Sequence, residues 1–252
     1  MSQWNSFVAV GDSFTEGLDD PYHDGGFRGW ADLVAGRLAA VSPGFRYANL
    51  AIRGRLLAPV IAEQVPAAVE MAPDLVSFAA GGNDVLRRGY DPDRVHATLD
   101  AVVAELTATG ARVLMFTAAD LTTVLPRAIG PRVRSFNNVI RVVAATHRAI
   151  LVDLWPDEGF RHVRMWSEDR LHLSSYGHER VASHVLEGLG VAYPPREDLP
   201  PVPRTPWLAA RWGDVRWARQ HLAPWIHRRL TGRSSGDTVK PKRPELAPLD
   251  SH

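Results

Sequence analysis

In residues 7 to 17, FVAVGDSFTEG, a short apolar run ends at Gly11 in a tight turn, and Ser13 lies where the chain leaves that turn. In an α/β domain, the loops at the carboxyl ends of parallel strands form the ligand crevice, so a serine in such a loop faces the substrate. Ser13 is therefore a candidate nucleophile. Taken alone, Gly-Asp-Ser is more typical of an ordinary turn or a helix N-cap.

Apolar runs alternate with helical periodicity along the next 180 residues. Short continuous apolar runs predict buried strands near 6 to 10, 46 to 52, 74 to 80, 111 to 118 and 149 to 154. Helical spacing predicts helices at 27 to 41, 59 to 71, 92 to 109, 131 to 147 and 175 to 188. This alternation predicts one three-layer α/β/α domain over residues 1 to 193, flavodoxin-like, with a mostly parallel five-stranded sheet.

Composition excludes several classes of protein. The chain has 252 residues, 45% of them apolar, which is enough for one substantial core and a small appendage. A net charge of +1 gives no overall field for nucleic acid, and the absence of cysteine removes disulfides, thiolate catalysis and cysteine metal sites. The first residues resemble no signal peptide, and no run is long enough to span a membrane, so we expect a soluble cytoplasmic protein.

The composition changes after Tyr193. Residues 194 to 206 contain six prolines and predict a stiff linker. Residues 207 to 233 predict a basic, Trp-rich helical extension, because seven arginines and one acid lie between 204 and 233, interleaved with tryptophans. The extension could pack on the core, or contact an anionic membrane surface or an acidic partner. We expect residues 234 to 252 to be disordered.

A serine nucleophile needs a base and a group that orients the base. Asp169 and His172 supply both within one loop, between the fifth predicted strand and the last helix. That loop lies on the same edge of the predicted sheet as Ser13. His172 would be the general base and then the general acid, and Asp169 would fix its tautomer. Taken alone, Asp169 and His172 are more typical of a surface loop with a helix-capping role.

Acyl transfer also requires donors for an oxyanion. Gly54 follows the second strand and lets its backbone N–H approach a ligand closely, and Asn83 in Gly81-Gly82-Asn83-Asp84 follows the third. With the N–H of Ser13, these give three donors, although Gly54 is also consistent with a residue that only ends a strand, and residues 81 to 84 with an ordinary turn. Metal binding is not expected, because His172, His178 and His184 are six residues apart and would not share a helix face.

Together these segments resemble the four ordered blocks of the SGNH hydrolases, the GDSL esterase/lipase superfamily. Block one is similar to Gly11-Asp12-Ser13-Phe14, with phenylalanine where the family often has leucine, and block two to Gly54. Block three is similar to residues 81 to 84, and the last block to 169 to 174, continuing into Gly177-His178. The resemblance covers about residues 5 to 190 and leaves out the linker and the tail.

The resemblance implies Ser13, Asp169 and His172 as the catalytic triad, and Ser13, Gly54 and Asn83 as the oxyanion hole. It implies a serine hydrolase that cleaves carboxylic esters through an acyl-serine, without metal or cofactor. Short-chain acyl or acetyl esters, the latter on a carbohydrate, are the first expected small-molecule substrates. A lysophospholipase or acyl-thioesterase is the alternative, and a catalytically idle ligand-binding module on the same fold is the non-enzyme alternative.

Overall fold

The structure, a computed structural model, describes residues 4–22, 25–120, 127–193, 199–200, 211, 215–217, 219–220, 223 and 234–249. Within these ranges one sheet has six strands in the order β5-β4-β3-β1-β2-β6. Five of them run parallel, as predicted: β1 (Ser6–Gly11), β2 (Arg46–Asn49), β3 (Leu75–Ala79), β4 (Arg112–Phe116) and β5 (Ile150–Val152). Their carboxyl ends therefore lie along one edge of the sheet.

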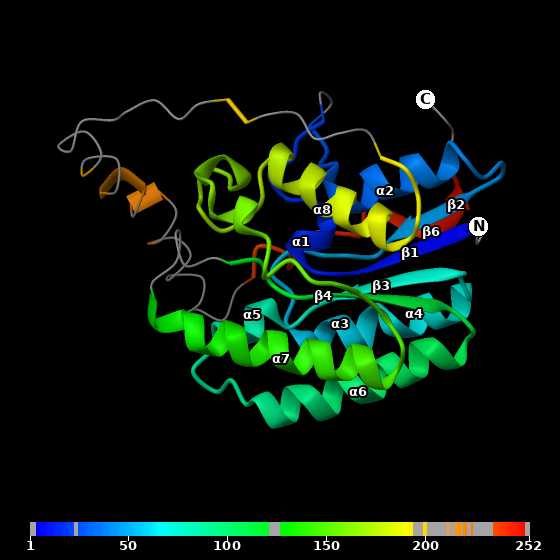
Figure 1. Cartoon of the computed structure of the whole chain (residues 1–252), viewed down its shortest axis with the longest axis horizontal. Helices are drawn as coiled ribbons and strands as arrows, with labels where there is room; N and C mark the ends of the chain where they lie inside the picture. The colour runs from blue at the N-terminus through cyan, green and yellow to red at the C-terminus, as the bar shows by residue number, and fades with distance from the viewer. Residues whose placement is uncertain are drawn as a thin grey trace.

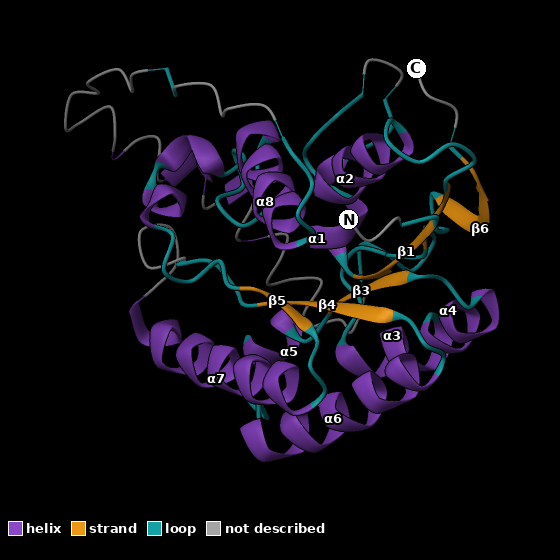
Figure 2. Ribbon diagram, turned by 45° about the vertical axis from the view of Figure 1, so that its right-hand side comes forward, coloured by secondary structure: helices purple, strands orange, loops and turns teal. Residues whose placement is uncertain are grey.

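Helices cover both faces of the sheet, which confirms the three-layer α/β/α prediction (Figure 1). On one side lie α1 (Ser13–Glu16), α2 (Gly29–Ala39) and α8 (Ser175–Gly188). The other side carries α3 (Leu57–Glu63), α4 (Val65–Met71), α5 (Gly82–Val85), α6 (Pro92–Ala108) and α7 (Gly130–Thr146). Figure 2 shows the sheet between these two layers. Short 3-10 turns, η1 (Arg127–Ile129), η2 (Glu158–Arg161) and η3 (Val163–Met165), lie in the loops.

Alternating residues of β1 pack into two separate apolar cores. Val8 and Val10 pack with the α3, α4, α6 and α7 side, and Phe7 and Ala9 pack with the α2 and α8 side. Every residue of β1 is buried, because β2 and β3 enclose both of its edges and an apolar core covers each of its faces. A strand buried on both faces reads as a continuous apolar run, which is why the sequence pattern identified it.

The single helix predicted over 59 to 71 is two helices, α3 and α4, which meet at Gln64. Pro66 lacks the N–H that would continue the hydrogen bonds of α3. The buried amide of Gln64 instead binds the backbone of Gly11, accepting from its N–H at 2.9 Å and donating to its carbonyl at 3.0 Å. The break thus places a polar side chain that holds the end of β1, directly before Ser13.

The prediction of disorder over residues 234 to 252 is wrong for 234–249. Residues Arg243–Pro248 form β6, which pairs antiparallel with β2 at the edge of the sheet and makes six strands instead of five. Its two prolines argue against a strand in sequence analysis, but an edge strand tolerates residues that donate no hydrogen bond on its outer side. Apart from residues 199–200, the linker predicted at 194 to 206 lies outside the described residues, and so does most of the extension at 207 to 233.

None of the helices in the described ranges combines the length and the apolar character needed to cross a bilayer.

Two glycine backbones touch beneath the Ser13 turn. Gly17 ends α1 with φ 89°, and Gly29 begins α2 with φ 77°. A Cβ atom on Gly29 would lie 2.3 Å from the Gly17 Cα, a distance at which the backbone must move. This contact fixes how α1 sits on α2.

We predict that Gly29→Ala destabilises the fold, while Gly36→Ala does not. The left-handed φ of Gly29 costs an alanine about 1–3 kcal/mol, and the clash with Gly17 adds to that loss. Gly36 is exposed in the middle of α2, where a Cβ atom would meet nothing beyond its own helix within 4 Å, and it should gain about 0.5–1 kcal/mol as alanine. Urea unfolding measures both free energies. A Gly29→Ala protein as stable as the parent would contradict the packing described.

Candidate active site

Ser13 is the first residue of α1, at the point where β1 ends. Gly11 lets the end of β1 lie close to β3, because a Cβ atom on it would lie 2.5 Å from the carbonyl oxygen of Ala79. Asp12 caps α1, its Oδ1 accepting from the Phe14 N–H at 3.1 Å. The serine hydroxyl is thus held on a short, fixed helical turn at the carboxyl edge of the sheet.

The three residues predicted as a triad lie together. His172 Nε2 is 3.1 Å from Ser13 Oγ, and His172 Nδ1 is 2.5 Å from Asp169 Oδ2. The other carboxylate oxygen, Oδ1, accepts from the N–H groups of Leu171 and His172, each at 2.9 Å. The turn that carries both residues therefore orients the carboxylate, and the carboxylate orients the imidazole.

The charged groups around the His172 ring suit its role as a general base. Burial raises the pKa of Asp169, but the hydrogen bond and positive charge of His172 outweigh it and hold that pKa well below its usual range. Burial lowers the pKa of His172, but the hydrogen bond and charge of Asp169 outweigh this in turn, so the net shift is upward. Ser13, the neutral imidazole and the carboxylate form the arrangement that activates a serine hydroxyl.

A second carboxylate, which sequence analysis missed, lies beside this pair. Asp19 adopts a left-handed φ of 68°, and its Oδ2 is 2.7 Å from the Ser167 hydroxyl and 3.8 Å from His172 Nδ1. The Ser167 hydroxyl is also 2.7 Å from Asp169 Oδ1. Asp19, Asp169 and His172 are close enough together to hold a metal ion. Nδ1 of the ring faces Asp169 and Nε2 faces Ser13, so an ion would compete with those contacts.

The predicted oxyanion donors Asn83 and Gly54 lie in α5 and in the loop after β2. Asn83 lines the same cavity as Ser13 and His172, and its Nδ2 donates to Asp12 Oδ2 at 3.1 Å and to the Arg55 carbonyl at 3.0 Å. Gly54 has a left-handed φ of 72° in the loop after β2, and it is not among the described residues that line the cavity. The Arg55 contact joins the Gly54 loop directly to Asn83.

His178, the last histidine of the fourth block, is buried and neutral. Burial lowers its pKa to about 4. Its Nδ1 accepts from the Trp30 N–H at 3.2 Å, and its Nε2 lies 3.3 Å from the Leu18 carbonyl, which a neutral ring can bind as a donor. This histidine therefore joins α8 to α2 and to the segment that follows α1.

An apolar cavity of about 190 Å³ opens beside Ser13. Its walls come from the ends of β3 and β4, from α5 and α7, and from the loop before α8. The apolar side chains that line it include Phe14, Val85, Phe116, Val133, Phe136, Ile140, Leu171 and Leu173. Polar groups lie at the Ser13 end, where Asn83 and His172 also face the cavity.

One described residue of the predicted basic extension touches the Asp169 turn. Trp217 Nε1 donates to the Asp169 carbonyl at 3.0 Å. The guanidinium of Arg170, a residue with a left-handed φ of 60°, lies 4.9 Å from the centre of the Trp217 ring. At this position the extension contacts the turn that carries Asp169.

Comparisons with known proteins agree with this geometry. A sequence model of the GDSL-like lipase/acylhydrolase family matches residues 9–180. The chain is 32% identical over 184 residues to the esterase TesA of Pseudomonas aeruginosa, which covers 71% of this chain and 85% of that protein.

Solved structures show the same fold. A crystal structure of TesA is 30% identical, with a TM-score of 0.61, covering 73% of this chain and 97% of that one. A variant of Axe2, an acetylxylan esterase from Geobacillus stearothermophilus, is 22% identical, with a TM-score of 0.66, covering 76% and 97%. At that identity, the second likeness speaks for the fold alone.

We predict that Asp169→Asn lowers turnover of an ester substrate by roughly 10³–10⁴-fold and changes its pH dependence. The base must be neutral, so activity is lost as the pH falls through the raised pKa of His172. Without the carboxylate that upward shift disappears, and the acid limb of kcat/KM moves to lower pH.

The matched control is Glu168→Gln, which removes an exposed negative charge from the neighbouring position. It should leave both the rate and the acid limb unchanged. An acid limb that stays in place in Asp169→Asn would show that this carboxylate does not set the pKa of the base.

Proposed function

Because the chain belongs to the GDSL-like lipase/acylhydrolase family, and is therefore a serine carboxylic ester hydrolase, we propose that Ser13, His172 and Asp169 hydrolyse esters of aliphatic acids at the cavity beside Ser13. The observation that carries the choice of residues is the line of contacts from Ser13 Oγ to His172 and on to Asp169, 3.1 and 2.5 Å long. The apolar cavity carries the choice of substrate.

The first half-reaction acylates the enzyme. Ser13 Oγ attacks the ester carbonyl carbon while His172 Nε2 takes the hydroxyl proton, and Asp169 stabilises the imidazolium that forms. The tetrahedral intermediate collapses with cleavage of the bond to the alcohol oxygen, which takes the proton from Nε2 as it leaves. In the second half-reaction, water gives a proton to Nε2 as it attacks the acyl-serine carbonyl. The bond to Ser13 Oγ then breaks, Oγ takes the proton back from Nε2, and the acid is released.

Negative charge on the carbonyl oxygen is stabilised by the N–H groups of Ser13 and Gly54 and by the amide of Asn83. Asn83 already donates to Asp12 and to the Arg55 carbonyl, so its amide is oriented before substrate binds. One of its hydrogens must turn toward the oxyanion as the charge develops. Burial raises the pKa of Asp12 to about 6, so this carboxylate is mostly ionised at neutral pH and loses strength as an acceptor only as the pH falls through that value.

The cavity favours an acyl group with several methylenes. Aromatic and aliphatic side chains make up most of its wall, and they offer few partners for hydroxyl groups. An aliphatic acyl chain would bury its length there, with its carbonyl at the polar Ser13 end. The relative TesA is an esterase, which supports cleavage of an ester at Ser13.

We predict that kcat/KM for p-nitrophenyl esters rises from acetate by about fourfold per added methylene until the cavity is filled. Each buried CH₂ contributes about 0.8 kcal/mol, which gives that factor. Ser13→Ala should abolish turnover across the series and serves as the control. An enzyme that is fastest on acetate would instead point to an acetyl esterase whose cavity stays empty.

We predict that Asn83→Ala lowers kcat by roughly a hundredfold or more, because one oxyanion donor typically supplies ~3 kcal/mol in the transition state. Steady-state kinetics measure this loss, and the midpoint of thermal unfolding shows whether the protein remains folded. A folded Asn83→Ala enzyme with a near-parental rate would remove Asn83 from the oxyanion hole.

A further inference from the structure

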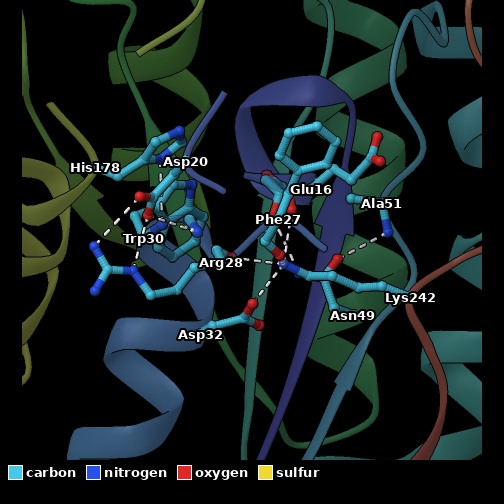
Figure 3. A network of polar contacts seen from close by, with 12 residues as sticks. Glu16, Asp20, Phe27, Arg28, Trp30, Asp32, Asn49, Ala51, His178 and Lys242 are labelled. Carbon is cyan, nitrogen blue, oxygen red and sulfur yellow. Dashed lines mark hydrogen bonds and ion pairs between the residues drawn. The ribbon is translucent and has the colours of Figure 1, made fainter. Parts of the chain in front are cut away.

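Lys242, directly before β6, reaches back to the nucleophile helix (Figure 3). Its ammonium donates to the carbonyl of Glu16 at 2.7 Å, of Phe27 at 3.0 Å and of Arg28 at 2.6 Å. It also forms an ion pair with Asp32 Oδ2 at 2.6 Å. Glu16 is the last residue of α1, and its carbonyl has no partner within that helix. One cation therefore ties the end of α1 to the start of α2.

The side chain of Glu16 carries this connection to the Gly54 loop. Its carboxylate accepts from the Arg53 N–H at 2.7 Å and from Arg53 Nε at 2.9 Å. The Glu16 side chain is only 6% exposed, so this ion pair works in a shielded environment. A single residue thus binds Lys242 through its backbone and the neighbour of Gly54 through its side chain.

A second part of the same segment packs on the Gly54 loop directly. A Cβ atom on Gly236 would lie 2.0 Å from the Arg53 carbonyl oxygen, and one on Gly54 would lie 2.3 Å from Ser234 Oγ. At Gly236 only glycine allows this approach, because the close atom belongs to the backbone, and at Gly54 the left-handed φ of 72° also favours glycine. Residues 234–249 therefore contact the Gly54 loop at one end and, through Lys242, the nucleophile helix.

This segment lies beyond the matched part of the family. The family model ends at residue 180, and 73% of this chain is enough to cover 97% of the solved TesA chain. Removing the segment would expose the edge of β2 and leave three carbonyls and Asp32 without the ammonium that they share.

We propose that residues 234–249 are a positioning element of the active site, with Lys242 holding α1 and, through Glu16 and Arg53, the Gly54 loop. The proposal rests on the proposed ester hydrolysis at Ser13. Lys242 touches no reacting atom and acts through the residues it positions. A shift of about 1 Å in an oxyanion donor can cost roughly 100-fold in rate, so small movements of this loop are sufficient.

The test compares Lys242→Met with Lys240→Met, an exposed lysine two residues earlier. Methionine keeps the apolar stem and removes the ammonium. We expect Lys242→Met to lower kcat by roughly 10- to 100-fold with KM little changed, and Lys240→Met to match the parent. Lys242→Arg, which retains the charge, should recover part of the loss.

Rates are expressed per active site, counted by the amount of fluorophosphonate bound to Ser13. A lysine that only stabilises the fold would lower the unfolding midpoint and the number of labelled sites, and leave kcat per site unchanged. A folded Lys242→Met enzyme with kcat per site within threefold of the parent overturns the proposal. A parent protein that is neither labelled nor active on any ester would instead contradict the proposed function.

If Lys242→Met does not fold, Gly236→Ala tests the same proposal. It leaves the Lys242 contacts in place but sets a methyl group against the Arg53 carbonyl. The proposal expects kcat per site to fall as the Gly54 loop moves, and an unchanged kcat per site would overturn it.

Discussion

A single contact, 3.1 Å long, between Ser13 Oγ and His172 Nε2 joins residues 159 positions apart. By itself such a hydrogen bond contributes about 1 kcal/mol, far too little to hold two loops together. The loops meet because β1 is enclosed between β2 and β3 and buried on both faces, while α8 anchors the other loop through His178 to Trp30 and Leu18. Burial of the core thus supplies the free energy that holds the two loops together, and the distance between Ser13 and His172 follows from that packing.

The parts of this arrangement that sequence could predict are those with a local signal. Runs such as FVAVG are apolar without alternation because both faces of the strand are covered, and a parallel sheet then brings Ser13, Gly54, Asn83 and His172 to one edge. In the sequence, Pro66 was the only sign that the helix breaks at Gln64. The role of that glutamine depends on Gly11, 53 residues away, and no local pattern contains it.

The roles that could not be predicted from sequence belong to residues whose contacts lie far away along the chain. Lys242 sits in a stretch rich in prolines and charge, which ordinarily stays solvated, and its acceptors lie more than 200 residues earlier in the chain. Burial lowers the pKa of Lys242, and the nearby Asp32 opposes that shift, so the ammonium is tolerable only where these acceptors converge. Asp19 likewise looks like one more acid after a turn until Ser167 and His172 lie beside it.

Several carboxylates lie at the carboxyl edge of the sheet near Ser13. The surroundings of each carboxylate, rather than its residue type, determine its role. Glu16 is neutralised by Arg53, and Asp12 lies in a buried position that raises its pKa to about 6. Burial likewise raises the pKa of Asp84, while its Oδ2 accepts from the Leu57 N–H. Asp169 faces the imidazole ring directly, and its pKa is driven far down by it. A group that must stabilise an imidazolium has to remain ionised when the cation forms. Of these four acids, Asp169 alone combines that ionised state with contact to the ring. Asp19 lies farther from the ring, 3.8 Å from Nδ1 against 2.5 Å for Asp169, so distance separates these two carboxylates.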